Sequence, residues 1–116
     1  MPETGTALEV RRANDQAAII AIRGELTGAT DGALMEAFGR AGDPSTRVVA
    51  LDFTELEYMN STGIGLLVTL LVRAQRQRQR LMAFGLSDHY RQILSLTRLD
   101  EAIGVVDGED EALAGA

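Results

Sequence analysis

The chain has 116 residues, of which 46% are hydrophobic and 24% charged, and this length and composition predict one globular domain with too little chain for two. It carries a formal net charge of −6 at pH 7 and 4% aromatic residues. All eleven of its basic residues are arginine. An acidic chain with few aromatic rings makes a poor nucleic-acid binder, because phosphate neutralisation needs clustered cations and base stacking needs rings. We therefore expect a protein partner and no nucleic acid.

Membrane and secretion signals are not visible in the sequence. The longest apolar run, residues 64–72, is interrupted by Gly65 and Thr69 and is shorter than a membrane span. The first residues lack a basic leader followed by an apolar segment. With no cysteine, the chain offers neither a disulfide framework nor a thiolate site. These features predict a cytoplasmic protein without direct membrane insertion.

Two short extended segments, residues 8–12 and 17–23, open the chain after a flexible stretch expected over residues 1–6. Asn14 and Asp15 lie between them and tolerate tight-turn geometry, so the two segments predict a β-hairpin. The second segment is the more continuously apolar and is expected deeper in the sheet. A loop over residues 24–28 then leads to a helix capped by Thr30 or Asp31.

The remaining elements alternate. The sequence predicts a strand over residues 48–52, a helix from about Ser61, a strand at 81–84, a helix at 88–97, a strand at 102–106, and a short helix and tail over 107–116. Each of these strands is followed by a helix, which favours a sheet with parallel neighbours covered by helices. Residues 1–116 are therefore expected to form a single α/β domain.

The helix that begins near Ser61 has an ambiguous apolar surface. A step of 100° per residue predicts a face directed at the core, made of Ile64, Leu67, Val68, Leu71 and Val72. Leu66 and Leu70 then fall on the flank, where they either contact a partner or lie under the next helix. The arginine-rich residues 73–80, with Arg73, Arg76 and Arg80 on one face, are typical of a solvated helix end that complements the helix dipole.

Catalytic and cofactor chemistry finds little support. His89 is the single histidine, and no carboxylate spacing suggests a metal site. Gly63 and Gly65 begin like a dinucleotide-binding loop, but Val68 stands at the third glycine position and there is no lysine for a phosphate loop. We expect no enzyme, no metal and no cofactor.

The polar turn Asn60-Ser61-Thr62 remains to be explained. Asn and Ser are among the best helix caps, yet one cap needs only one of the three residues. The following Gly63 and Gly65 each cost the helix about 1 kcal/mol relative to alanine, and their small size could let another protein approach closely. A helix cap and a phosphate acceptor remain as alternatives for this turn.

The stretch around this turn resembles the STAS family, the domain shared by sulphate transporters and anti-sigma factor antagonists. The antagonists carry a strand ending in Asp, an apolar-aromatic approach and a D-S-[ST]-G-[LIV]-G turn. Here these read Leu51-Asp52, Leu56-Glu57-Tyr58-Met59 and Asn60-Ser61-Thr62-Gly63-Ile64-Gly65. Two weaker matches flank them, Gly24-Glu25-Leu26 for the family's G-E-L/I-D element and Asp110-Glu111-Ala112-Leu113 for its last helix.

The resemblance implies a four- to five-stranded mixed sheet with helices packed mainly on one side, and a switch in place of a catalytic centre. The unphosphorylated antagonist of this family binds an anti-sigma factor that is also a serine kinase. The kinase phosphorylates the serine that matches Ser61, and a serine phosphatase reverses the modification. The implied phosphorylation loop and partner-binding surface comprise Asn60, Thr62, Gly63, Ile64, Gly65, Leu66 and Leu70.

Two residues depart from the antagonist pattern. Asn60 and Thr27 stand where the antagonists usually carry Asp, and Thr27 is expected at a possible pocket beside the turn. Both substitutions keep polarity and remove charge. They favour the alternative hypothesis of a STAS adaptor or scaffold subunit of a signalling complex or transporter, which binds constitutively and uses the polar turn only as a cap.

Overall fold

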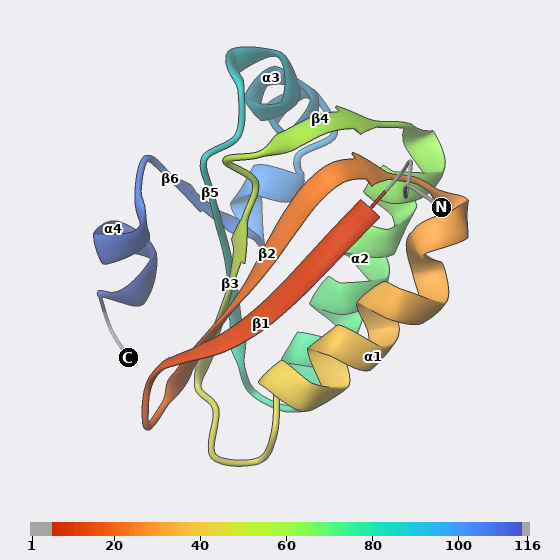
Figure 1. Cartoon of the computed structure of the whole chain (residues 1–116). Helices are drawn as coiled ribbons and strands as arrows, with labels where there is room; N and C mark the ends of the chain where they lie inside the picture. Colours follow the sequence, from red (N-terminus) through yellow and green to blue (C-terminus); the bar gives the residue numbers. More distant parts are fainter. Residues whose placement is uncertain (1–5, 115–116) are drawn as a thin grey trace.

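A mixed β-sheet organises the protein in the computed structural model, which describes residues 6–114 (Figure 1). Its strands are β1 (Thr6–Asn14), β2 (Ala17–Leu26), β3 (Val48–Asp52), β4 (Leu56–Met59), β5 (Arg80–Phe84) and β6 (Gly104–Val106). The strand order is β1-β2-β3-β5-β6, and β4 pairs with β2. The β1–β2 hairpin is antiparallel, and the other strand pairs are parallel.

The helices cover the two faces of the sheet unequally. They are α1 (Asp31–Ala41), α2 (Ser61–Arg76), α3 (Asp88–Leu96) and α4 (Glu109–Leu113), with the 3-10 turns η1 (Gly28–Thr30) and η2 (Leu99–Glu101). The main core lies between the sheet and the side chains of α1, α2 and α3, including Phe38, Leu67 and Leu94. A smaller core lies on the opposite face, where Ala112 of α4 packs. The expected α/β domain with helices mainly on one side is confirmed.

The sheet has one strand more than the four to five expected, because β4 was not anticipated. Only Met59 of its four residues is buried, so β4 lacks the apolar pattern of a core strand. It pairs with the end of β2, where Gly24 lies opposite Leu56 and Leu26 opposite Met59, so β2 continues through part of the loop expected at residues 24–28. Strand β3 pairs with the first half of β2 and β4 pairs with its last residues. The chain therefore leaves β4 beside the end of β2, where α2 begins.

The rotation of α2 about its axis is determined by Gly63. A Cβ built on Gly63 would lie 2.2 Å from the carbonyl oxygen of Leu26 in β2, a distance that no side chain tolerates. The helix can therefore lie this close to β2 only with glycine at this position. Steps of three and four residues from Gly63 direct the next side chains toward the core, and the buried set is Gly63, Leu66, Leu67, Leu70 and Ala74.

This rotation corrects the expected faces of α2. Leu66 and Leu70 were expected on the flank and near a partner, but their exposed fractions are 7% and 0%. Val68 and Val72 were expected in the core, but they are 39% and 40% exposed. The expected face is one residue out of step because the sequence suggests Gly63 for a turn or partner surface, whereas Gly63 is buried against the protein's own β2.

The far end of α2 also differs from expectation. The helix ends at Arg76, Arg78 has a left-handed backbone (φ 58°), and Arg80 begins β5. Contrary to what the sequence suggested, Arg80 therefore does not share a helical face with Arg73 and Arg76.

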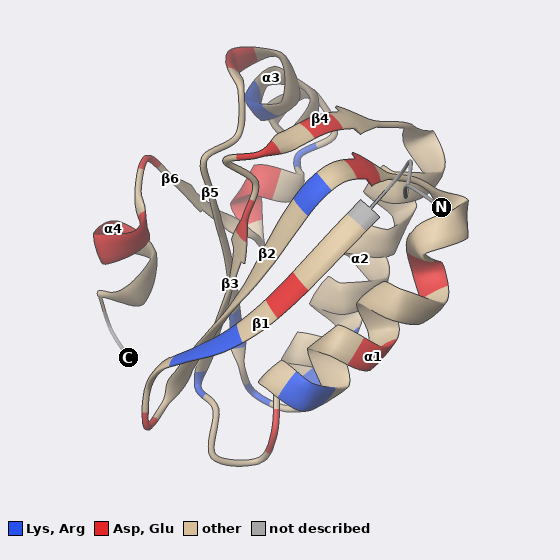
Figure 2. Ribbon diagram, in the orientation of Figure 1, with Lys and Arg blue, Asp and Glu red and all other residues tan. Residues whose placement is uncertain are grey.

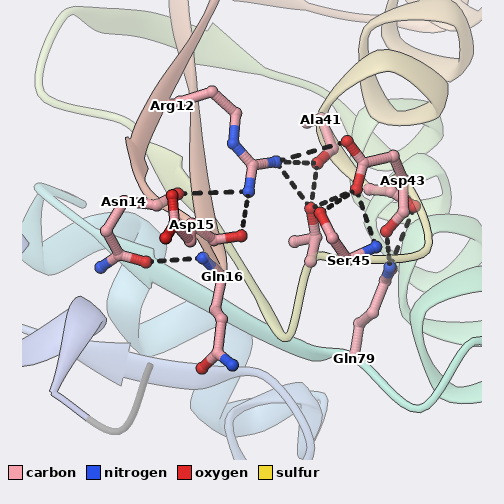
Figure 3. Close-up of polar contacts among 10 residues, drawn as sticks. Arg12, Asn14, Asp15, Gln16, Ala41, Asp43, Ser45 and Gln79 are labelled. Carbon is pink, nitrogen blue, oxygen red and sulfur yellow. Dashed lines mark hydrogen bonds and ion pairs between the residues drawn. The ribbon is translucent and has the colours of Figure 1, made fainter.

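A polar network holds this end of the molecule together (Figure 3). The buried Gln79 donates from Nε2 to the carbonyl oxygens of Gly42 and Asp43 at 2.9 and 3.0 Å, linking the α2–β5 loop to the α1–β3 loop.

The close approach of Gly63 to β2 predicts opposite effects for two glycine substitutions in α2. Gly63→Ala should lower the free energy of unfolding by about 3 kcal/mol, because the new methyl group forces α2 away from β2. Gly65→Ala is the matched control: a Cβ there meets nothing within 4 Å, so the substitution should raise stability by up to about 1 kcal/mol. Urea denaturation measures both, and equal effects of the two substitutions would contradict the assigned rotation.

Candidate functional site

The polar turn lies where four elements meet: the end of β2, the end of β4, η1 and the start of α2. The Asn60 amide donates to the carbonyl oxygen of Leu26 at 3.3 Å, which attaches the turn to β2. On the η1 side, a Cβ built on Gly28 would lie 3.1 Å from Cγ2 of Thr62. Backbone pairing and close packing therefore fix the position of the turn.

Asn60 is the N-cap of α2. Its backbone is extended (φ −96°, ψ −178°), and its Oδ1 accepts a hydrogen bond from the Gly63 amide at 2.9 Å. Its carbonyl oxygen accepts the first helical bond, from the Ile64 amide at 3.0 Å. This is the arrangement in which asparagine best stabilises a helix start. The cap that the sequence allowed for either Asn60 or Ser61 is thus provided by Asn60.

Ser61 is the first residue of α2 and is exposed. Within residues 6–114, its hydroxyl takes part in no hydrogen bond, and the same holds for Thr62. The backbone amides of Ser61 and Thr62 also lack an acceptor in this part of the chain. The start of α2 therefore presents a free hydroxyl beside two free amides, at the end of the helix where the dipole favours negative charge.

Other predicted site residues lie around Ser61 with different roles. Thr27 caps η1: its Oγ1 accepts from the Ala29 amide at 3.3 Å, and its amide donates to Thr30 Oγ1 at 3.2 Å. Ile64 is half-buried against the core, and Gly65 is exposed.

A cavity of the described chain lies away from Thr27, and the pocket expected beside Thr27 stays a prediction. That cavity has a volume of about 310 Å³ and is lined by α2, β5, η2 and β6 residues such as Gln75, Arg80 and Gly104. Thr27 is not part of its lining. The observed role of Thr27 is that of a turn cap.

Tyr90 supports the site and was not predicted to do so. Its hydroxyl oxygen accepts a hydrogen bond from the Met59 amide at 2.8 Å, so α3 holds the strand that leads into Asn60. Its ring packs edge-on against His89, with ring centroids 4.9 Å apart. Helical spacing placed Tyr90 on the inner face of α3, but nothing local in the sequence indicates a bond to a residue 31 positions earlier.

Within residues 6–114, no cluster of three or more His, Asp or Glu side chains is arranged to hold a metal ion. No helix in that range combines the length and the apolar character needed to cross a bilayer.

The Tyr90–Met59 hydrogen bond predicts that removing the hydroxyl of Tyr90 lowers stability more than removing the hydroxyl of Tyr58. Tyr90→Phe should lower the free energy of unfolding by about 1–2 kcal/mol and speed hydrogen exchange at the Met59 amide, because that amide loses its acceptor. Tyr58→Phe is the control, since Tyr58 is exposed and its hydroxyl forms no hydrogen bond among the described residues; it should change stability by less than about 0.5 kcal/mol. Unchanged Met59 exchange in Tyr90→Phe would show that α3 does not hold β4.

Comparison with known proteins places these features in a family. A family model described as the STAS domain of Mlab matches residues 10–107. The anti-sigma-B factor antagonist of Listeria monocytogenes is 28% identical over 105 residues, which cover 90% of this chain and 92% of that protein.

Solved structures share the same fold. An anti-sigma factor antagonist from Mycobacterium paratuberculosis aligns with a TM-score of 0.80 at 21% identity, covering 95% of this chain and 92% of that one. The Bacillus cell fate determinant SpoIIAA in its phosphorylated form aligns with a TM-score of 0.72 at 18% identity, covering 90% and 94% of the two chains. Since the family model spans the sheet from β1 to β6 and includes the Ser61 turn, the chain belongs to the STAS domain family.

Proposed function

We propose that the protein is an anti-sigma factor antagonist that works in the cytoplasm. In its unmodified form it binds an anti-sigma factor with serine kinase activity, and phosphorylation of Ser61 by that partner ends the complex. A serine phosphatase restores the binding form. The observation that carries the proposal is the free, exposed Ser61 hydroxyl beside a helix cap that Asn60 already provides. The similarity to an anti-sigma-B factor antagonist supports the choice of partner.

A phosphate on Ser61 fits the geometry of the unbound protein. Phosphorylation adds a charge of about −1.5 to −2 and strong acceptor oxygens. The free amides of Ser61 and Thr62 can donate to these oxygens, and the positive end of the α2 dipole favours the charge. The free protein therefore keeps its fold when modified. A partner seated over Ser61 would have to bury that charge, and binding is lost by desolvation and repulsion.

The exposed face of α2 extends this site along the helix. Gly65, Val68 and Val72 follow Ser61 at helical spacing and are exposed. Exposed apolar residues of this kind suit a partner contact. Val68 and Val72 therefore take the place on the proposed partner surface that the sequence suggested for Leu66 and Leu70.

The switch predicts different effects for two replacements of Ser61. Ser61→Asp should weaken binding to the cognate anti-sigma factor by at least about 100-fold, because a buried unpaired carboxylate costs several kcal/mol. Ser61→Ala should keep binding within about threefold of the wild type and should prevent phosphate incorporation. Isothermal titration calorimetry measures the affinity, and mass spectrometry after incubation with the kinase and ATP locates the phosphate.

Ser95→Asp is the control for added charge, because Ser95 is exposed on α3 and its hydroxyl forms no hydrogen bond within the described chain. It should bind like the wild type. Phosphate found only at other residues would refute Ser61 as the acceptor. Full affinity of Ser61→Asp would refute the switch.

A second candidate function is a constitutive STAS adaptor in a signalling complex or transporter. The Asn60–Gly63 hydrogen bond favours it, because that bond alone gives the polar turn a structural role. The adaptor would bind its partner equally well as wild type and as Ser61→Asp, and it would be recovered from cells with a transporter or a large assembly and without a kinase.

A further inference from the structure

Uncompensated positive charge gathers at the end of the molecule opposite Ser61. Most described arginines are engaged: six form ion pairs, and Arg73 donates to the Met35 carbonyl oxygen and lies over the Phe38 ring. Four exposed arginines form no ion pair with any described acid, and we call them the basic end: Arg47, Arg76, Arg78 and Arg80. Figure 2 shows positive segments at the end where β3 and β5 begin.

Hydrogen bonds hold the backbone beneath the basic end in place. The Arg80 amide donates to the carbonyl oxygen of Arg47 at 2.8 Å. The Gln79 amide donates to the carbonyl oxygen of Ala74, also at 2.8 Å. The buried Gln79 side chain ties the same loop to the α1–β3 loop (Figure 3). The arginines therefore extend from a fixed base, and less loop entropy is lost when they bind.

Arg78 is the residue that a structural role explains least. Its backbone is left-handed (φ 58°), two residues after the last residue of α2, where glycine is the usual choice because a Cβ is disfavoured. Arg98 is the one other non-glycine residue with positive φ in residues 6–114, and its guanidinium pairs with Glu101 at 2.9 Å. Arg78 has no such partner. An arginine in a costly conformation, whose side chain forms no hydrogen bond or ion pair with the described residues, points to an external contact.

The acids near the basic end do not neutralise it. Asp43 is already occupied: hydrogen bonds from Ser45 lower its pKa, and Arg12 lies 3.7 Å from its carboxylate. Asp100 and Glu101 line the same cavity as Arg80 without pairing with it. Of the four arginines, Arg80 alone lines this cavity, and Arg47, Arg76 and Arg78 lie outside it.

We propose that the basic end is a second docking surface, which binds an acidic protein segment. Guanidinium groups pair with carboxylates through two parallel hydrogen bonds, so fixed arginines suit a row of Asp or Glu side chains. The net charge of −6 repels any polyanion, and this repulsion grows with the length and charge of the partner, so a short acidic segment is favoured over DNA, RNA or an anionic membrane. None of the four arginines has an aromatic neighbour in the sequence on which a base could stack.

This surface is separate from the one proposed around Ser61. Ser61 and Arg76 occupy the two ends of α2, about 22 Å apart for a helix of this length. Both surfaces can be occupied at the same time. An acidic segment at the basic end would then bring a second protein to the antagonist.

Fluorescence polarisation with a labelled octaglutamate peptide tests the proposal. The wild type should bind the peptide at low ionic strength, and Arg78→Gly should weaken binding at least about fivefold. The melting temperature of Arg78→Gly should stay equal or rise, because glycine accommodates the left-handed backbone. Arg98→Gly is the matched control with the same change of charge and backbone, and it should bind like the wild type.

Three results would overturn the proposal. The first is no binding of octaglutamate by the wild type. The second is an equal loss in Arg78→Gly and Arg98→Gly, which would indicate a general charge effect. The third is tighter binding of oligothymidylate or of phosphatidylglycerol vesicles than of octaglutamate. Arg78→Gly should also leave anti-sigma factor binding and Ser61 modification unchanged, so the two proposals fail independently.

Discussion

The approach of Gly63 to the carbonyl oxygen of Leu26 is the contact on which the rest of the site depends. It brings the first turn of α2 against the end of β2, where only a residue without a side chain fits. Once that contact is made, the helix has no freedom to rotate, and Leu66 and Leu70 must enter the core. The same rotation exposes Ser61, Gly65, Val68 and Val72. A packing constraint inside the molecule thus determines which residues a partner can reach.

Different residues hold the turn before α2 in place and present its free hydroxyl. Asn60 satisfies the Gly63 amide and begins the helix, while Tyr90 holds β4 in place through Met59. The Ser61 hydroxyl then forms no hydrogen bond within the described chain, which is compatible with the modification proposed for it. Asparagine at position 60 gives the cap without placing a negative charge beside the phosphate proposed for Ser61. A scaffold that is complete without the serine hydroxyl is what a reversible modification requires.

Much of the fold follows from local sequence. Apolar runs in the sequence predict β2, β3 and β5, and apolar residues at helical spacing predict α1 and α3. Burial on a sheet or helix face produces such patterns. The strand β4 leaves no such trace, since it is short, mostly exposed and held by pairing with β2 and by Tyr90. The rotation of α2 was missed for a related reason. It depends on contact between Gly63 and Leu26, 37 positions away, and periodicity in a mostly apolar stretch fits two faces almost equally well.

The division of work between Asn60 and Ser61 is tested most directly by the unfolding free energies of Asn60→Ala and Ser61→Ala, measured side by side by urea denaturation. Loss of the cap should lower stability by about 1 kcal/mol in Asn60→Ala, whereas Ser61→Ala should remain within about 0.5 kcal/mol of the wild type. A larger loss in Ser61→Ala than in Asn60→Ala would show that the serine hydroxyl supports the fold. It would contradict the claim that Ser61 is free to act as a switch.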